Sequence, residues 1–171
     1  MAEKKGVLVE TERYENLDAL RVLSLLPMLP YQHVADVGCR SGFFTVPLGK
    51  YLFDGRVYAL DAQQEMLDEA KKAVDIIHLT NIEYKLTKGD KIPLEDDSLD
   101  GALIAFAMHE VKSATALLEE AERSLRKGGW LAILEMSTDE LDLDEMARKA
   151  GFHLQVKHKL NDTQYMLLMR K

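Results

Sequence analysis

Apolar runs of strand length alternate with amphipathic runs of helical length along most of this chain. Strand-like runs occupy residues 33–38, 55–61, 81–86, 99–108 and 130–136, and helical runs occupy 43–53, 63–77, 112–129 and 142–151. A helix between two strands carries the chain back across one face of the sheet, so that both strands run in the same direction. The pattern therefore predicts an α/β fold with a doubly wound, mostly parallel sheet.

The last part of the chain departs from this alternation. Two consecutive strand-like runs, 152–160 and 164–170, flank the turn residues Asn-Asp-Thr and predict a closing hairpin. The hairpin adds one antiparallel strand and brings the expected sheet to seven strands.

The first part of the chain is expected to be helical. Leucines recur near helical spacing between residues 16 and 29, with Asn16 or Asp18 as the expected N-cap and Pro27 near the end. We interpret residues 1–30 as a helical segment that covers a single domain of 171 residues.

Composition restricts the cellular setting and the partners. The net charge of −7 argues against nucleic acid, because such binding depends on Lys and Arg neutralising phosphates. The single cysteine, Cys39, cannot form an internal disulfide, which suits the reducing cytoplasm. No run resembles a signal peptide or is long enough to cross a bilayer, so we expect no membrane partner. The spacing of the histidines predicts no metal site.

The stretch DVGCRSG, residues 36–42, joins the first expected strand to the helix that follows. Ligands of doubly wound sheets bind beside this turn, at the carboxyl ends of the strands. Gly38 permits a tight turn because it has no Cβ, and Gly42 lets the helix start lie close to a ligand. That helix start offers free N–H groups to an anion such as a carboxylate.

Two further acidic positions fit a nucleoside. Asp61 ends the second strand, 19 residues after Gly42, where a carboxylate can accept both ribose hydroxyls. Asp90 follows the third strand and can accept the amino group of adenine, while the backbone N–H of Lys91 can face a ring nitrogen. These positions predict a site for an adenosine-containing ligand.

The glycine pattern discriminates between two such ligands. A dinucleotide site uses G-x-G-x-x-G for close approach to a pyrophosphate, but from Gly38 onward the other two positions hold Arg40 and Phe43. S-adenosylmethionine has no phosphate. Its carboxylate would suit the helix start, and Asp36 lies near the expected place of its ammonium group. A nicotinamide oxidoreductase is therefore the least favoured interpretation.

These segments resemble those of class I S-adenosylmethionine-dependent methyltransferases, in particular the ubiquinone/menaquinone C-methyltransferase subgroup. The matching segments are VADVGCRSG, VYALDAQQEMLDEAKK, GDKIPLEDDSLDGALIAFAMHEV, SLRKGGWLAILE and ARKAGF. They occur in the family's order and cover roughly residues 33–171. The resemblance implies a Rossmann-like methyltransferase fold with a reversed last strand. It also implies S-adenosylmethionine as cofactor and S-adenosylhomocysteine as product.

The resemblance also implies which residues bind the cofactor and the acceptor. The cofactor residues are Asp36, Gly38, Cys39, Arg40 and Gly42 at the methionine end, Asp61, Ala62, Met66, Asp90 and Lys91 at the nucleoside, and Ala105 and Phe106 beside the ligand. His109 matches a histidine on the substrate side and is the candidate catalytic residue, with a structural role as the alternative. We interpret Cys39 as a small filler of the turn and not as a nucleophile.

Two departures from the family pattern leave alternatives open. Arg40 replaces a glycine at the centre of the turn, where its side chain can either pair with the ligand carboxylate or crowd it. Only MSTDEL, residues 136–141, follows the fifth strand, where many relatives carry a long insert over the substrate. The pocket is then open, or it is closed by residues 1–25 or by a second subunit of a homodimer.

The resulting functional hypothesis is in-line methyl transfer to a small molecule. The proline-aromatic signature of enzymes that methylate amino groups of nucleic acids is absent after the fourth strand, where AFAM stands. The alternative hypothesis is a catalytically silent methyltransferase-like module that binds the nucleoside or a partner protein.

Overall fold

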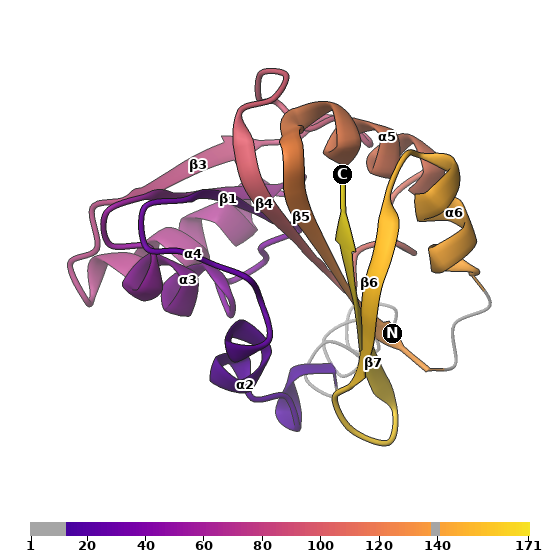
Figure 1. Ribbon diagram of the computed structural model, residues 1–171. Coiled ribbons are helices and arrows are strands. Elements are labelled where there is room, and N and C mark those ends of the chain that lie inside the picture. Colours follow the sequence, from indigo (N-terminus) through magenta and orange to yellow (C-terminus); the bar gives the residue numbers. More distant parts are fainter. Residues whose placement is uncertain (1–12, 138–140) are drawn as a thin grey trace, which may run out of the picture.

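The computed structural model describes residues 13–137 and 141–171, which form one seven-stranded sheet flanked by helices (Figure 1). The strands are β1 (His33–Val37), β2 (Arg56–Asp61), β3 (Ile82–Leu86), β4 (Leu99–Ala105), β5 (Leu125–Met136), β6 (His153–Lys159) and β7 (Gln164–Arg170). Their order across the sheet is β3-β2-β1-β4-β5-β7-β6, and β7 is antiparallel to both of its neighbours. The expected α/β class, the mostly parallel sheet and its reversed last strand are confirmed.

Helices cover both faces of this sheet. They are α2 (Ala19–Ser24), α3 (Thr45–Tyr51), α4 (Gln64–Asp75), α5 (Ala114–Ser124) and α6 (Leu143–Lys149). The core residues of α2 and α3 pack on one face around Trp130 and Leu103, and those of α5 and α6 pack on the other around Ile104 and Ile133. Strand residues alternate between the two clusters because successive side chains of a strand point to opposite faces.

The strand order creates the crevice that the sequence predicts. The chain runs outward from β1 through β2 to β3, then returns to the other side of β1 and continues through β4 to β5. Crossovers on the two sides of β1 therefore diverge at its carboxyl end, beside residues 38–42. This is the switch point at which such sheets bind ligands.

The N-terminal helix is shorter than predicted. Asp18 is its N-cap and accepts hydrogen bonds from the backbone N–H groups of Leu20 and Arg21, as one of the two expected caps. The helix ends at Ser24, three residues before Pro27, which the sequence predicts near its end. Pro27 lacks an N–H group and disfavours helical geometry in the residue before it. Residues 1–12 of the proposed covering segment lie outside the described part.

The boundary between α5 and β5 also differs from the prediction. Residues 112–129 were expected to form a helix closed by two glycines, but β5 already begins at Leu125, which pairs with Leu99 of β4. The register between these strands shifts before Gly101 pairs with Trp130. Gly128, at φ +78°, therefore belongs to an irregular stretch within a strand and not to a helix end.

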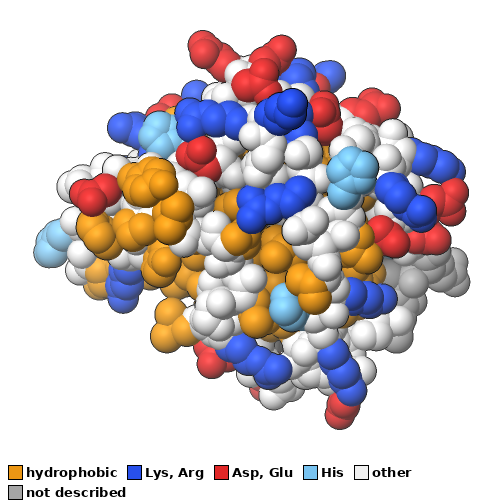
Figure 2. All heavy atoms as spheres, in the orientation of Figure 1, with side chains coloured by type: hydrophobic (Ala, Val, Ile, Leu, Met, Phe, Trp, Pro, Cys, Tyr) orange, Lys and Arg blue, Asp and Glu red, His pale blue; other side chains and the backbone are white. Residues whose placement is uncertain are grey.

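The amino ends of the parallel strands carry exposed apolar side chains. Tyr31 and Phe53 lie just before β1 and β2 and are both exposed. Figure 2 shows apolar side chains gathered at the left, on the side of these strand starts in Figure 1. The predicted ligand crevice lies at the opposite ends of the same strands.

Candidate functional site

A cavity of about 250 Å³ opens at the carboxyl ends of β1 to β4. Each of these strands delivers part of its wall. The lining residues are Val37, Gly38, Asp61, Ala62, Gln63, Thr87, Gly89, Asp90, Lys91, Ala107, Glu110, Val111, Lys112 and Leu117. The cavity therefore occupies the crevice predicted from the strand–helix alternation.

The first turn is fixed by backbone contacts to β2. The N–H groups of Gly38 and Cys39 both donate to the carbonyl of Leu60, at 2.8 and 2.9 Å. Gly38 has φ +73°, and a Cβ there would lie 3.0 Å from the Cβ of Ala107. Glycine is thus required both by the turn and by the closeness of the segment after β4.

Gly42 has a structural role in addition to the one expected. Its φ is +92°, and a Cβ at this position would lie 3.2 Å from the backbone of Ala70 in α4. The helix α3 begins only at Thr45, three residues later. The glycine therefore permits close packing of the turn on α4, a reason that the sequence spacing did not reveal.

Asp61 is held in place by the backbone of the first turn and of its own loop. Its Oδ2 accepts the N–H of Arg40 at 2.9 Å, and its Oδ1 accepts the N–H of Gln63 at 3.0 Å. Each carboxylate oxygen has two lone pairs, so both can accept a further hydrogen bond. Asp61 can therefore bind two hydroxyls of a ligand while staying anchored.

Asp36 lies beneath the turn and is 2% exposed. Burial, together with the nearby charge of Asp61, raises the pKa of its carboxyl to about 7, against the hydrogen bond donated by Thr45 Oγ1 at 2.6 Å. A positive group of a ligand near Asp36 would favour its ionised form.

Cys39 is buried between Ala59 and Leu67. Burial raises the pKa of its thiol well above the ordinary value, and the charges of Asp36 and Asp61 act in the same direction. The thiol stays protonated at neutral pH, so it lacks the character of a nucleophile.

The wall opposite the first turn comes from the loop after β3. Asp90 Oδ1 accepts the backbone N–H of Lys112 at 2.9 Å, which ties the loop to the segment before α5. The ammonium group of Lys91 pairs with Glu120 at 3.1 Å. The backbone N–H of Lys91 makes only a long contact of 3.4 Å to the carbonyl of Lys88.

Arg40 turns toward a glutamate that sequence reasoning missed. Its guanidinium pairs with Glu110, which also accepts a hydrogen bond from Arg13 Nη1 at 2.9 Å. Arg13 donates in addition to the carbonyl of Phe106 at 3.3 Å. Glu110 thus joins the first turn, the segment after β4 and the N-terminal segment. In the sequence, the only signal for this role of Glu110 is its position next to the candidate residue His109.

Of the other predicted residues, Ala62 lines the cavity and the remaining four do not. Ala105 and Phe106 are buried next to the lining residue Ala107, and the ring of Phe106 packs against Tyr14 at 5.3 Å between centroids. Met66 on α4 is half-buried, and His109 is exposed; neither belongs to the lining. The roles of all twelve cofactor residues and of His109 remain predictions.

Comparison with known proteins identifies the family. A model described as a methyltransferase domain matches residues 35–133, more than half of the chain. The chain belongs to this methyltransferase family.

Relatives of this methyltransferase differ from it in length. A demethylmenaquinone methyltransferase of Bacillus mycoides is 29% identical over 140 residues, which cover 80% of this chain and 59% of that protein. A ubiquinone/menaquinone biosynthesis C-methyltransferase of Rickettsia felis is 34% identical over 110 residues, 61% of this chain and 44% of that protein. The methyltransferase thus spans about half the length of these curated relatives.

A solved structure agrees over nearly the whole fold. A SAM-dependent methyltransferase of Aquifex aeolicus has a TM-score of 0.86 at 27% identity, covering 98% of this chain and 97% of that one. Between residues 13 and 137 and from 141 onward, no helix of the methyltransferase is both long and apolar enough to traverse a bilayer. The same described residues contain no cluster of three or more potential metal ligands.

Proposed function

We propose that this methyltransferase transfers a methyl group from S-adenosylmethionine to a small-molecule acceptor by in-line displacement. The observation that carries the proposal is that Asp61, the last residue of β2, and Asp90, in the loop after β3, line one cavity together with Gly38. A nucleoside in this cavity would place its ribose at Asp61 and its adenine at Asp90.

The charges around the cavity support a cationic ligand. Asp61, Asp90 and Glu110 line it together with Lys91 and Lys112. Glu110 is paired with Arg40, and Asp36 lies below. S-adenosylmethionine carries a positive sulfonium and an ammonium group, both of which these carboxylates attract. A dinucleotide would instead bring a doubly negative pyrophosphate to the same carboxylates. The residues therefore fit the adenosyl sulfonium better than NAD.

The main contribution of the protein to the reaction is to position the cofactor and the acceptor. The sulfonium supplies a methyl group that is already activated for transfer. The residues of the turn and of the two acidic positions hold the nucleoside, and close alignment with the acceptor lowers the barrier. His109 would act as a general base only for an acceptor that must lose a proton.

Aromatic side chains beside the first turn support a planar acceptor. The ring of Tyr14 lies 4.7 Å from that of Phe43 and 5.3 Å from that of Phe106, which follows β4. Tyr14 of the segment 1–30 thus packs against the first turn and the segment after β4. Relatives named for quinone biosynthesis make a quinone-type ring the first acceptor to test.

Calorimetry with S-adenosylmethionine and S-adenosylhomocysteine tests the cofactor. Asp61→Ala should weaken binding of both by at least tenfold, because a hydrogen bond to a charged group contributes about 1.5–3 kcal/mol. Asp54→Ala is the matched control: it removes the same charge at the other end of β2 and should leave affinity within twofold.

Three other outcomes would contradict parts of the proposal. Wild-type protein that binds neither nucleoside refutes the cofactor, and binding of NADH instead would favour an oxidoreductase. Tight nucleoside binding without S-adenosylhomocysteine formation on any quinone, phenol or amine acceptor would favour the silent module.

A further inference from the structure

The loop between β3 and β4, residues 87–98, forms one wall of the cavity without regular secondary structure. Asp90 and Lys91 in this loop are the residues proposed to recognise adenine. A wall that reads a base must hold its groups within a fraction of an ångström. The contacts of the loop with α5 explain how it keeps its shape.

Arg123 of α5 gathers the backbone of this loop. Its Nη2 donates to the carbonyl of Ile92 at 2.9 Å, and its Nη1 donates to the carbonyl of Leu94 at 3.0 Å. The same guanidinium pairs with Asp96, farther along the loop. The planar fork of arginine reaches these acceptors together, which the single ammonium group of lysine cannot do.

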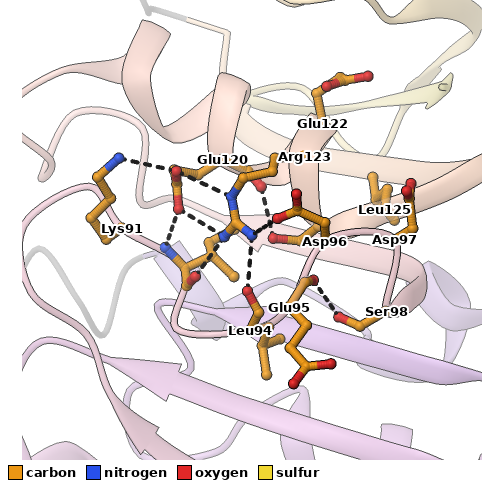
Figure 3. A network of polar contacts seen from close by, with 12 residues as sticks. Lys91, Leu94, Glu95, Asp96, Asp97, Ser98, Glu120, Glu122, Arg123 and Leu125 are labelled. Atoms are coloured by element: carbon orange, nitrogen blue, oxygen red, sulfur yellow. Dashed lines mark hydrogen bonds and ion pairs between the residues drawn. The ribbon is translucent and has the colours of Figure 1, made fainter.

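Glu120, one turn earlier on α5, completes the clamp. Its Oε2 accepts the backbone N–H of Ile92 at 3.1 Å, and its Oε1 accepts the Lys91 ammonium at 3.1 Å. Arg123 also donates two hydrogen bonds to Glu120, so the two side chains are bonded to each other as well as to the loop. Figure 3 shows the guanidinium between Glu120 and Asp96, with Lys91 on the other side of Glu120.

Glu120 is buried, Arg123 is partly exposed, and the pair keeps its charge. Ile92 is 2% exposed and packs in the core with Leu117 and Leu118, so its backbone groups need partners within the protein. Burial alone would raise the pKa of Glu120, but the hydrogen bonds from Arg123, Ile92 and Lys91 outweigh it and lower the pKa to about 2. Glu120 stays ionised throughout the physiological range.

We propose that Glu120 and Arg123 are positioning residues for the nucleoside: they fix residues 90–94 against α5 and thereby set the affinity of the cavity for adenine. This inference rests on the proposed function, since it takes the cavity to bind a nucleoside. Neither side chain lines the cavity, so they act through Asp90 and Lys91.

Arg123→Met and Arg123→Lys test the proposal, with Arg126→Met as the matched control. Arg126 also bonds a carbonyl and a carboxylate, those of Asp97 at the end of the loop and Asp100 in β4, neither of which lines the cavity. Calorimetry compares S-adenosylhomocysteine with methylthioadenosine, which lacks the amino-acid tail. Each titration is run well below the midpoint of thermal unfolding of the variant used, so that unfolding does not alter the measured affinity.

Arg123→Met should weaken both ligands by the same factor, at least tenfold, because the loss lies at their shared nucleoside. Arg123→Lys should weaken both ligands to a smaller extent, and Arg126→Met should stay within twofold of wild type. The opposing outcome is that Arg123→Met binds both ligands within twofold of wild type and shows only a lower unfolding temperature. The pair would then stabilise the fold without affecting nucleoside affinity, and the proposal would be overturned.

Amide hydrogen exchange of the free protein provides a readout that needs no ligand. Arg123→Met should accelerate exchange at Ile92, bonded to Glu120, and at Lys112, bonded to Asp90, whereas Arg126→Met should not. Unchanged exchange at both amides would also overturn the proposal. A wild-type protein that binds no nucleoside would refute the proposed function instead, and the exchange rates would still decide whether the pair fixes this loop.

Discussion

Asp36 and Glu110 show what single positions reveal before a structure is known. Asp36, Asp61 and Asp90 could be chosen from the sequence because each lies near the carboxyl end of a recognisable strand or in the loop after it. Glu110 could not be chosen, because its partner Arg40 is 70 residues away and its meaning depends on that contact. The unusual environment of Asp36, a buried carboxyl next to a second acid, was equally hidden in the sequence.

At the residue scale, Asp36→Asn should change how stability depends on pH. The pKa of Asp36 rises from 3.8 in the unfolded chain to about 7 in the fold, so ionisation costs the wild type stability as pH increases from about 4 to about 7. Asparagine keeps an acceptor for Thr45 and removes this cost. Urea unfolding should find the variant more stable by up to about 4 kcal/mol at pH 8, with no such difference near pH 4.

The same substitution should weaken binding of the proposed cofactor, because the ammonium group of S-adenosylmethionine would no longer face the carboxylate of Asp36. A gain in stability with a loss of affinity is the usual compromise at a binding site. Equal stability of the two proteins at pH 8 would show that Asp36 is not the costly buried acid that its surroundings indicate.

At the element scale, the type of the strands and helices and their order along the chain could be predicted, but several of their ends could not. The glycine pair at 128–129 is a typical helix end in sequence terms. In the structure, pairing of Leu125 with Leu99 ends α5 earlier, and the glycines fall inside β5. A contact between strands thus overrides the local signal of the glycine pair, and the periodicity of the sequence carries no information about that contact.

Gly101 of β4 offers an element-scale test of how β4 and β5 fit. A Cβ on Gly101 would lie 2.0 Å from Cε2 of Trp130, which is fully buried on the neighbouring strand. Gly101→Ala should lower the free energy of unfolding by about 3 kcal/mol, the upper part of the usual range for overpacked cores. Urea titration measures this loss.

A second substitution checks the cause. Trp130→Leu alone should also destabilise the protein by leaving a cavity, but the double variant should be less destabilised than the sum of the two single variants. Strict additivity would mean that the alanine and the indole do not clash.

At the scale of the whole molecule, the doubly wound architecture followed from the alternation of strands and helices, and it predicted a crevice where the structure has its cavity. The strand order required the structure, because nothing in the sequence of the hairpin tells on which side β7 enters. What closes the acceptor side was likewise open. The described residues place Arg13 and Tyr14 against the first turn and the segment after β4.

This strand order predicts unequal local stability across the sheet. β1 and β4 lie between strands on both sides and are almost entirely buried, whereas β6 pairs with β7 alone among the described strands and is largely exposed. Hydrogen exchange followed by NMR should find amides of β1 and β4 that exchange only on global unfolding, and faster exchange throughout β6. Protection in β6 equal to that in β1 would contradict this ranking.

The insertion of β7 between β5 and β6 also has a consequence for synthesis on the ribosome. β6 leaves the exit tunnel first, yet its position in the sheet does not exist until β7 has settled beside β5. The β6 segment of the nascent chain therefore remains unpaired, with its histidine- and lysine-rich surface in water, until the β7 segment emerges.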